Sequence, residues 1–472
     1  MEKIKLPLLY DYVFPNFILP NALPTELSII NYLHSQHSNR INDHSFFDEH
    51  HSIANYDNLL TYLFDYDFGH WSSSWGGDPC ITTGNYSHLI DIDSSSLYFG
   101  KRKYTKYIYP IRVTPHFNNF TGVCERGRKI NGEIFWKFMS AQALSDARKG
   151  NALILLDYCL ENFVEKFEYE NLHSSLKNSK IPKEQILLIM NSFNAQQLYE
   201  EWFTEDQQRI TVRNFPYLMS AISYRANDAE QMISETRFKL SKNQIRKNYF
   251  VYKNHRPRSQ RKAFLYSLYS NNLLDNSDWS WITDEKINHQ DMLVLESIYN
   301  LSVDTEKVKE INNLIPRKLA SEPNAKEDTA VGWKGSDSTT YSNSYFDVCT
   351  ETRVNGEHNI LTEKIFFPIA YFQPFLFYGI KGSLKLLRQQ GFKTFHPYID
   401  ESYDDEPNIG LRLKMIVEEV KKLCSLSKEE LHSWYWNLED ILIYNHRHLK
   451  SIYLTDPSTM SLFEYLDKKI NS

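Results

Sequence analysis

Cysteine and glycine are scarce in this chain. Its 472 residues include 5 cysteines and 16 glycines. The cysteines are odd in number and lie far apart, at positions 80, 124, 159, 349 and 424. They form neither a disulfide framework nor the paired spacing of a zinc site. We therefore expect a protein of a reducing compartment, without structural disulfides.

An excess of positive charge is also missing. Lysine and arginine total 53 against 59 aspartate and glutamate residues, which gives a formal net charge of −6. Proteins that bind duplex DNA usually carry a basic stripe as their electrostatic footprint. The composition therefore disfavours nucleic acid as a partner.

No run of apolar residues is long enough to span a bilayer. The most apolar stretch covers residues 365–380, and Pro368, Gln373 and Pro374 interrupt it. Residues 1–7 lack the apolar core of a signal peptide. We expect a cytoplasmic protein without a membrane span.

Several common catalytic motifs are absent as well. The chain contains no Gly-x-Gly-x-x-Gly, no Walker loop, no His-Glu-x-x-His and no Gly-x-Ser-x-Gly. These absences argue against a nicotinamide dehydrogenase, a P-loop NTPase, a zinc protease and a serine hydrolase.

Short apolar runs do alternate with helical segments in the middle of the chain. Residues 104–113, 152–157 and 185–190 are predicted strands, and residues 158–168 and 195–203 are predicted helices. This alternation is typical of a parallel sheet with crossover helices. Such doubly wound sheets bind ligands outside the carboxyl ends of their strands.

A cationic strand–loop–helix unit begins near residue 248. Residues 248–252 alternate as a strand does, and residues 263–270 are predicted to be helical. Arginine matches phosphate oxygens with a bidentate fork, and the free amides at a helix start add to the attraction. The unit is therefore either a phosphate site or a basic surface loop. Four cations lie within seven positions around the predicted helix start, namely Arg256, Arg258, Arg261 and Lys262.

A second helix start carries an adjacent carboxylate and ammonium. Thr362 is a predicted N-cap, and Glu363 and Lys364 follow it in the first turn. A lysine there opposes the helix dipole, but beside free backbone N–H groups it makes a good anion site. The alternative is that both charges simply face water. Pro368 is expected to kink this helix.

These two units resemble the donor-binding motif of fucosyltransferase-like glycosyltransferases with the GT-B fold, including those predicted in phage and giant-virus genomes. One part of the resemblance is Thr362–Lys364, followed by an apolar helix and the aromatic run 375–378 that stops at Gly379. The other is Tyr252–Asn254 with Arg261 heading the next helix.

The resemblance covers residues 241–472 and implies a nucleotide diphosphate sugar as donor. In that family a glutamate binds the ribose hydroxyls and a lysine the phosphates, which assigns these roles to Glu363 and Lys364. Arg261 would stabilise the leaving diphosphate, so neither a divalent metal nor a cofactor is implied. Glu351 follows a predicted strand and is placed to reach the sugar. The predicted donor-binding set is Tyr252, Asn254, Arg256, Arg258, Arg261, Glu351, Glu363 and Lys364.

Two carboxylates are candidates for the catalytic base. Asp157 ends a predicted strand, and Glu161 stands one turn into the predicted helix that follows. An inverting transfer to a hydroxyl acceptor, such as a glycan, needs a carboxylate to take the hydroxyl proton. The alternative is that Asp157 caps the helix and Glu161 is solvated.

The predicted architecture is an α/β protein of GT-B type, with two Rossmann-like domains facing a cleft. Residues 1–100 are an N-terminal extension of unclear fold, and residues 101–240 are the acceptor domain. Residues 241–425 are the donor domain, and residues 426–472 are C-terminal helices that brace the two domains.

Three alternatives remain at this point. One is a viral glycosyltransferase that modifies bases in DNA. Another is a non-catalytic sugar-binding or structural protein that retains the fold. The third is a metal-dependent GT-A enzyme, in which Asp91 and Asp93 would hold the cation before a predicted turn at Ser94–Ser96.

Overall fold

The computed structural model describes most of the chain beyond residue 140 and several segments before it. The described ranges are 4–10, 90–96, 105–112, 117–118, 123–124, 141–159, 164–205, 209–227, 233–254, 257–319 and 338–471. Two of the candidate residues, Glu161 and Arg256, lie outside these ranges.

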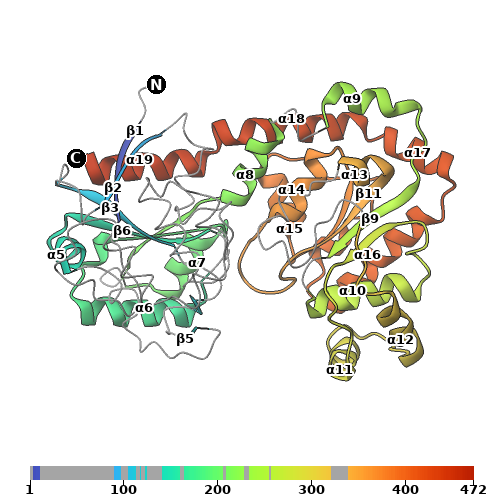
Figure 1. The fold of residues 1–472 in the computed structure, drawn as a ribbon, viewed down its shortest axis with the longest axis horizontal. Helices are drawn as coiled ribbons and strands as arrows, with labels where there is room; N and C mark the ends of the chain where they lie inside the picture. Colours follow the sequence, from blue (N-terminus) through green and yellow to red (C-terminus); the bar gives the residue numbers. More distant parts are fainter. Residues whose placement is uncertain are drawn as a thin grey trace, which may run out of the picture.

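A six-stranded, all-parallel sheet forms the first domain, which we call the six-stranded domain (Figure 1). Its strands follow the order β2 (Ile90–Ser96), β1 (Ile4–Tyr10), β3 (Tyr107–Arg112), β6 (Ala152–Tyr158), β7 (Ile186–Met190) and β8 (Thr211–Asn214). The prediction of a parallel sheet is confirmed. The predicted turn at Ser94–Ser96 is wrong, because these serines continue β2. A separate antiparallel pair joins β4 (Phe117–Asn118) to β5 (Val123–Cys124).

Both faces of this sheet are covered, which explains why its strands read as continuous apolar runs. Ile154 and Leu156 point to one face, where they meet side chains of α5, α6 and α7. Leu153 and Leu155 point to the other, where they meet α8 and α19. The helix bounds are α5 Ala141–Lys149, α6 Lys166–Ser179, α7 Ala195–Trp202, α8 Tyr217–Ala226 and α19 Pro457–Asn471.

A second parallel sheet forms the four-stranded domain. Its order is β10 (Asp278–Trp281), β9 (Asn248–Asn254), β11 (Ser344–Thr350) and β12 (Phe375–Tyr378). The helices of this half are α9 Glu235–Leu240, α10 Ser259–Ser270, α11 His289–Ser297, α12 Thr305–Leu314, α13 Ser338–Asn343, α14 Glu363–Ala370, α15 Ser383–Gln389, α16 Ile409–Cys424, α17 Lys428–Trp436 and α18 Glu439–Thr455.

The register aligns the carboxyl ends of these four strands. Trp281 lies opposite Asn254, and Thr350 lies opposite Tyr378. Helix α10 begins shortly after β9, and α14 follows β11 after a loop. The N-termini of both helices therefore meet at the same edge of the sheet.

The last two helices connect the two halves. Helix α18 packs on α14 and on α8, and α19 then joins the core of the six-stranded domain (Figure 1). Ser223 of α8 and Asn227, which follows that helix, donate hydrogen bonds to the carbonyls of Leu449 and Lys450 in α18. None of the helices in the described part of the chain combines the length and apolarity that a bilayer crossing requires.

Local sequence patterns predicted some of the helix boundaries near the candidate residues correctly. Thr362 is the N-cap of α14, as predicted, and its hydroxyl accepts from the Lys364 N–H. The helix runs through Pro368 and ends at Ala370. The helix predicted over residues 158–168 is wrong in its start, because α6 begins only at Lys166.

Candidate functional site

Two cations from distant parts of the sequence interact electrostatically with the same pair of carboxylates, Glu351 and Glu363. Arg261 stands in the first turn of α10, and Lys364 stands in the first turn of α14. Arg261 is only 5% exposed, and its burial lowers the pKa of the guanidinium, an effect that the charges of Glu351 and Glu363 oppose. The two helix N-termini and their cations thus form one site at the edge of the four-stranded sheet.

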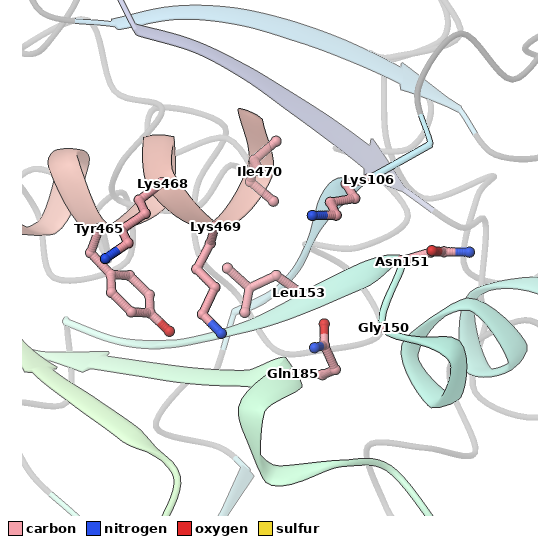
Figure 2. Close-up of a pocket in the computed structure, with 9 residues that line it drawn as sticks. All are labelled: Lys106, Gly150, Asn151, Leu153, Gln185, Tyr465, Lys468, Lys469 and Ile470. Carbon is pink, nitrogen blue, oxygen red and sulfur yellow. The ribbon is translucent and has the colours of Figure 1, made fainter. Parts of the chain in front are cut away.

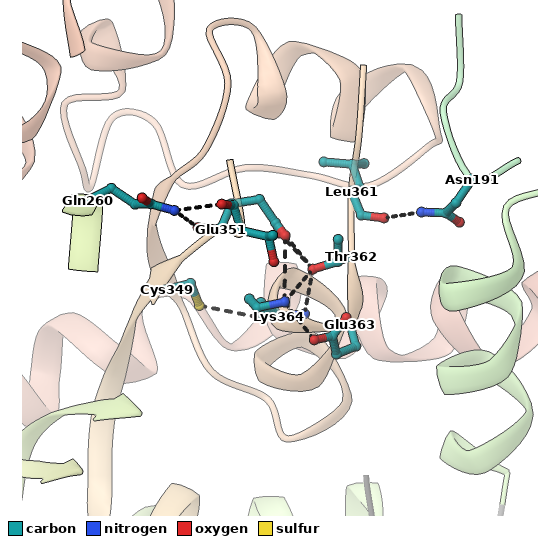
Figure 3. A network of polar contacts seen from close by, with 9 residues as sticks. Asn191, Gln260, Cys349, Glu351, Leu361, Thr362, Glu363 and Lys364 are labelled. Carbon is teal, nitrogen blue, oxygen red and sulfur yellow. Dashed lines mark hydrogen bonds and ion pairs between the residues drawn. The ribbon is translucent and has the colours of Figure 1, made fainter. Parts of the chain in front are cut away.

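The Lys364 ammonium is held by three oxygen atoms (Figure 3). It lies 2.6 Å from Glu363 Oε1, 3.1 Å from the Thr362 hydroxyl and 3.8 Å from Glu351 Oε1. The Lys364 side chain remains 25% exposed, and that of Glu363 remains 22% exposed. An ammonium in this position can exchange one of these oxygens for an incoming anion.

Glu351 is the buried member of this cluster. It is 2% exposed, and the Thr362 hydroxyl lies 2.5 Å from its Oε1 and 2.6 Å from its Oε2. Burial raises the pKa of Glu351, and the charge of Lys364 opposes this rise. Burial acts on Glu363 in the same direction, but the charge of Lys364 and the hydrogen bonds that Glu363 accepts together lower the pKa of Glu363. The pKa values of the two carboxyl groups are therefore shifted in opposite directions, and perturbed pKa values of this kind are frequent at functional sites.

Tyr252 and Asn254 lie on strand β9, next to the candidate site. Tyr252 is fully buried, and its hydroxyl donates to the carbonyl of Arg261 at 3.1 Å, which fixes the start of α10. Asn254 ends β9 and is 2% exposed. Neither polar atom of its amide is in hydrogen-bonding geometry with another described residue.

The remaining cations of the basic cluster do not all join this site. Arg258 is the N-cap residue of α10 and is exposed. Lys262 is buried and makes ion pairs with Glu285 at 2.7 Å and Asp291 at 2.8 Å. Lys262 therefore ties α10 to the start of α11 and is not placed to bind an anion.

The loop between β11 and α14 also carries the contact between the two domains. Five hydrogen bonds join it to residues that follow β7. Three use carbonyls of the loop as acceptors: from Asn191 Nδ2 to Leu361 (3.1 Å), from the Phe193 N–H to Asn359 (2.8 Å) and from Asn194 Nδ2 to Glu357 (2.8 Å). The other two join the Asn359 N–H to Asn194 Oδ1 (2.7 Å) and the Ser192 hydroxyl to His358 Nδ1 (3.2 Å). The candidate site thus borders the seam between the domains, next to the carboxyl end of the six-stranded sheet (Figure 3).

Asp157 lies at this carboxyl end, one strand away from Asn191. It pairs in register with Ile189 of β7 and is 1% exposed. Its carboxylate accepts a hydrogen bond from the Cys159 N–H at 3.0 Å. It therefore caps the turn that leaves β6 and not the helix that follows, because α6 begins only at Lys166. Glu161 follows within the undescribed segment 160–163.

Sequence reasoning missed a group of ionisable residues at the seam. Glu165 and Arg353 form an ion pair across it at 3.0 Å. Glu168 accepts a hydrogen bond from the Glu165 N–H at 2.5 Å, and burial raises its pKa to about 7. Burial likewise lowers the pKa of His358 to about 4. The only sequence signal was the Glu-x-x-Glu spacing of a capping box, and burial cannot be seen in such a spacing.

In the described part of the chain, no group of three or more His, Cys, Asp or Glu side chains is arranged to hold a metal ion. Asp91 and Asp93 lie within strand β2, which pairs with β1 at the edge of the six-stranded sheet.

Comparisons with known proteins give little. No model of a known protein family matches the chain, and neither does a curated protein. Among solved structures, the chain is similar to one described as "Crystal structure of GtfA/B complex", with 9% sequence identity and a TM-score of 0.33. The match covers 70% of this chain and 55% of that chain, so it spans about half the length of its structural neighbour. A similarity of this size is too weak to assign a fold or an activity.

Replacing Thr362 tests whether one hydroxyl both caps α14 and compensates Glu351. Thr362→Ala removes the N-cap and leaves a buried carboxylate without its donor, which should lower the free energy of unfolding by roughly 2–4 kcal/mol. Thr362→Ser keeps the hydroxyl and should cost less than about 1 kcal/mol. Urea denaturation of both variants provides the measurement. Equal losses for alanine and serine would contradict the assigned role.

Glu168 should make the protein less stable as the pH rises. Its folded-state pKa is about 7 against an ordinary value of 4.5, so its stabilising contribution is complete below pH 4.5 and is lost as the pH rises to 7. The loss is on the order of 3 kcal/mol. Glu168→Gln keeps the capping acceptor and should flatten this part of the profile. Urea denaturation of both proteins at pH 5 and pH 7.5 measures the difference, and parallel profiles would contradict the raised pKa.

Proposed function

We propose that this protein is a glycosyltransferase of GT-B architecture that transfers a sugar, with inversion, from a nucleotide diphosphate donor to a hydroxyl acceptor. In this proposal the four-stranded domain binds the donor and the six-stranded domain binds the acceptor. The observation that carries it is the convergence of Arg261 and Lys364 on Glu351 at two helix N-termini.

This convergence suits a diphosphate in three ways. Two helix N-termini present free N–H groups and the positive ends of two dipoles to one point. Arg261 adds a planar fork and Lys364 a compact charge, a pair that can contact two neighbouring phosphates. The same two cations can offset the charge that develops on the leaving diphosphate, without a metal ion.

The carboxylates suit the rest of a sugar nucleotide. Glu363 has a lowered pKa and is ionised, so it can accept hydrogen bonds from two ribose hydroxyls. Glu351 has a raised pKa, which weakens its repulsion of a neighbouring phosphate. Asn254, which has a buried amide, can donate to the sugar or the diphosphate. Arg256 and Arg258 stand before α10 in the chain and remain candidates for the outer phosphate contacts.

The acceptor side offers two candidate bases. Asp157 lies at the carboxyl end of β6, whose neighbour β7 leads directly into the seam, and Glu161 follows four residues later in the sequence. Glu168 has a pKa suited to a base, but its carboxylate completes the capping box of α6 by accepting from the Glu165 N–H. We assign proton removal to Asp157 or Glu161, because they end or follow β6, and a structural role to Glu168.

Removing the converging cations should abolish donor binding. Lys364→Ala and Arg261→Ala should eliminate the rise in melting temperature that nucleotide diphosphate sugars produce, because each variant loses a charge-assisted contact to the diphosphate. A thermal-shift screen with UDP-, GDP-, ADP- and CDP-sugars provides the measurement. Lys309→Ala removes a lysine that is 64% exposed on α12 and should leave the shift intact.

Arg261 is buried, so its alanine variant can lose stability for structural reasons. Arg261→Lys keeps the charge without the fork, and we expect it to fold and to bind the donor about tenfold more weakly. An unchanged shift in Lys364→Ala, or an unchanged donor affinity in Arg261→Lys, would overturn the proposed donor site.

The two candidate bases are separated by comparing amide variants. Asp157→Asn and Glu161→Gln keep size and hydrogen bonding but cannot take a proton, so the variant of the true base should lose at least a hundredfold in transfer rate. Donor binding by thermal shift should remain unchanged in both. Release of free nucleotide in the presence of an acceptor measures the rate. If both variants kept full activity, neither residue would be the base.

A further inference from the structure

A cavity of about 450 Å³ opens at the amino end of the strands of the six-stranded sheet, opposite the end that borders the candidate functional site (Figure 2). Lys106, Asn151 and Gln185 line it, and each stands directly before a strand, namely β3, β6 and β7. The last turns of α19 close the other side. Because these strands are parallel, the cavity lies at their amino ends, whereas the candidate functional site borders their carboxyl ends. The two sites are separated by the length of the sheet.

The lining is cationic, and none of the described residues that form it has an acidic side chain. Lys106, Lys468 and Lys469 contribute three ammonium groups. Lys106 makes no ion pair or hydrogen bond through its side chain with another described residue, and Lys469 Nζ donates only to the carbonyl of Glu184, at 3.4 Å. Figure 2 shows Lys106 and Lys469 approaching from different sides of Leu153. The cavity therefore offers converging positive charge.

Further polar donors and an apolar floor complete the cavity. The side-chain amides of Asn151 and Gln185 make no hydrogen bond to another described residue. Leu153 and Ile470 supply aliphatic surface between them. A few polar groups above apolar walls, in a volume of roughly 300–1,000 Å³, are typical of sites for small organic ligands.

The preference for cations in the last turn of a helix explains the position of only some of these lysines. Lys468 and Lys469 stand in the last turn of α19, where a cation is favoured in any helix. Lys106 belongs to no helix and gains nothing from that effect. Like charges that face one cavity, as Lys106 and Lys469 do, repel one another, and an anion bound between them weakens the repulsion.

We infer that this cavity binds a small phosphomonoester. Its phosphate dianion lies between Lys106 and Lys469 and accepts from the amides of Asn151 and Gln185, and its organic part covers Leu153 and Ile470. Lysine binds phosphate as a point charge, and a dianion balances the lining better than a single carboxylate does. This inference is independent of the proposed donor site.

Calorimetric titration with inorganic phosphate and with a hexose 6-phosphate tests the inference. We expect one bound equivalent of the hexose phosphate and weaker binding of inorganic phosphate, which lacks the organic part. Lys106→Gln combined with Lys469→Gln should weaken binding about a hundredfold, tenfold for each lysine. Absence of binding to the wild-type protein, or equal affinity for the two ligands, would overturn the inference.

Two control variants locate the binding. Lys385→Gln combined with Lys414→Gln makes the same change of net charge at exposed positions of the four-stranded domain and should leave affinity unchanged. Lys364→Ala should also bind the hexose phosphate normally, because its lesion lies in the proposed donor site. Loss of binding in Lys364→Ala would place the phosphate there and contradict the inference.

A measurement on the unmodified protein covers the case in which the double variant fails to fold. Bound hexose phosphate should slow acetylation of Lys106 and Lys469 severalfold, as measured by mass spectrometry, and leave Lys385 unaffected. Equal acetylation rates with and without the ligand would overturn the inference.

Discussion

The four-stranded domain depends on the compensation of one buried carboxylate, that of Glu351. A buried charge is costly unless it is hydrogen-bonded and paired. The Thr362 hydroxyl meets this need at 2.5–2.6 Å while it also caps α14, and Lys364 and Arg261 supply the opposite charge. One carboxylate therefore fixes the start of one helix and draws in a cation from another. The anion site that we propose is a consequence of the way Glu351 is buried.

Parallel topology places this cluster where a ligand can bridge both domains. The strands on each side end at the same edge of their sheet, so the loops that follow them meet at the seam. The loop between β11 and α14 serves both purposes: its end carries Thr362–Lys364, and residues 357–361 bond to the segment after β7. Later in the chain, helices α18 and α19 connect the two halves a second time. Helix α18 packs on α8 and α14, and α19 packs into the core of the six-stranded domain. The site and the domain contact therefore belong to one continuous piece of backbone.

Local chemistry explains what the sequence predicted well. The strand at Phe375–Tyr378, the N-cap at Thr362 and the parallel sheet all follow from neighbouring residues and apolar runs. Long-range contacts explain what it did not. The helix after β6 starts at Lys166, later than its pattern indicated, and the pKa of Glu168 depends on burial that no short motif encodes. The roles assigned to the donor-binding residues and to the two bases stay predictions.

The different surroundings of Lys262 and Lys364 show why a count of charges cannot identify a binding cation. Both lysines lie in the first turn of a helix at the same sheet edge. Lys262 is 5% exposed and is held by two carboxylates from the β10–α11 region, so an anion would have to displace both. Lys364 is 25% exposed, and its closest carboxylate partner, Glu363, is 22% exposed, so both groups are in contact with solvent. An incoming diphosphate can replace that partner without leaving a buried charge uncompensated, because Glu351 keeps the Thr362 hydroxyl. Accessibility of the carboxylate partner, more than the presence of the lysine, is why we propose α14 as the helix that binds the diphosphate.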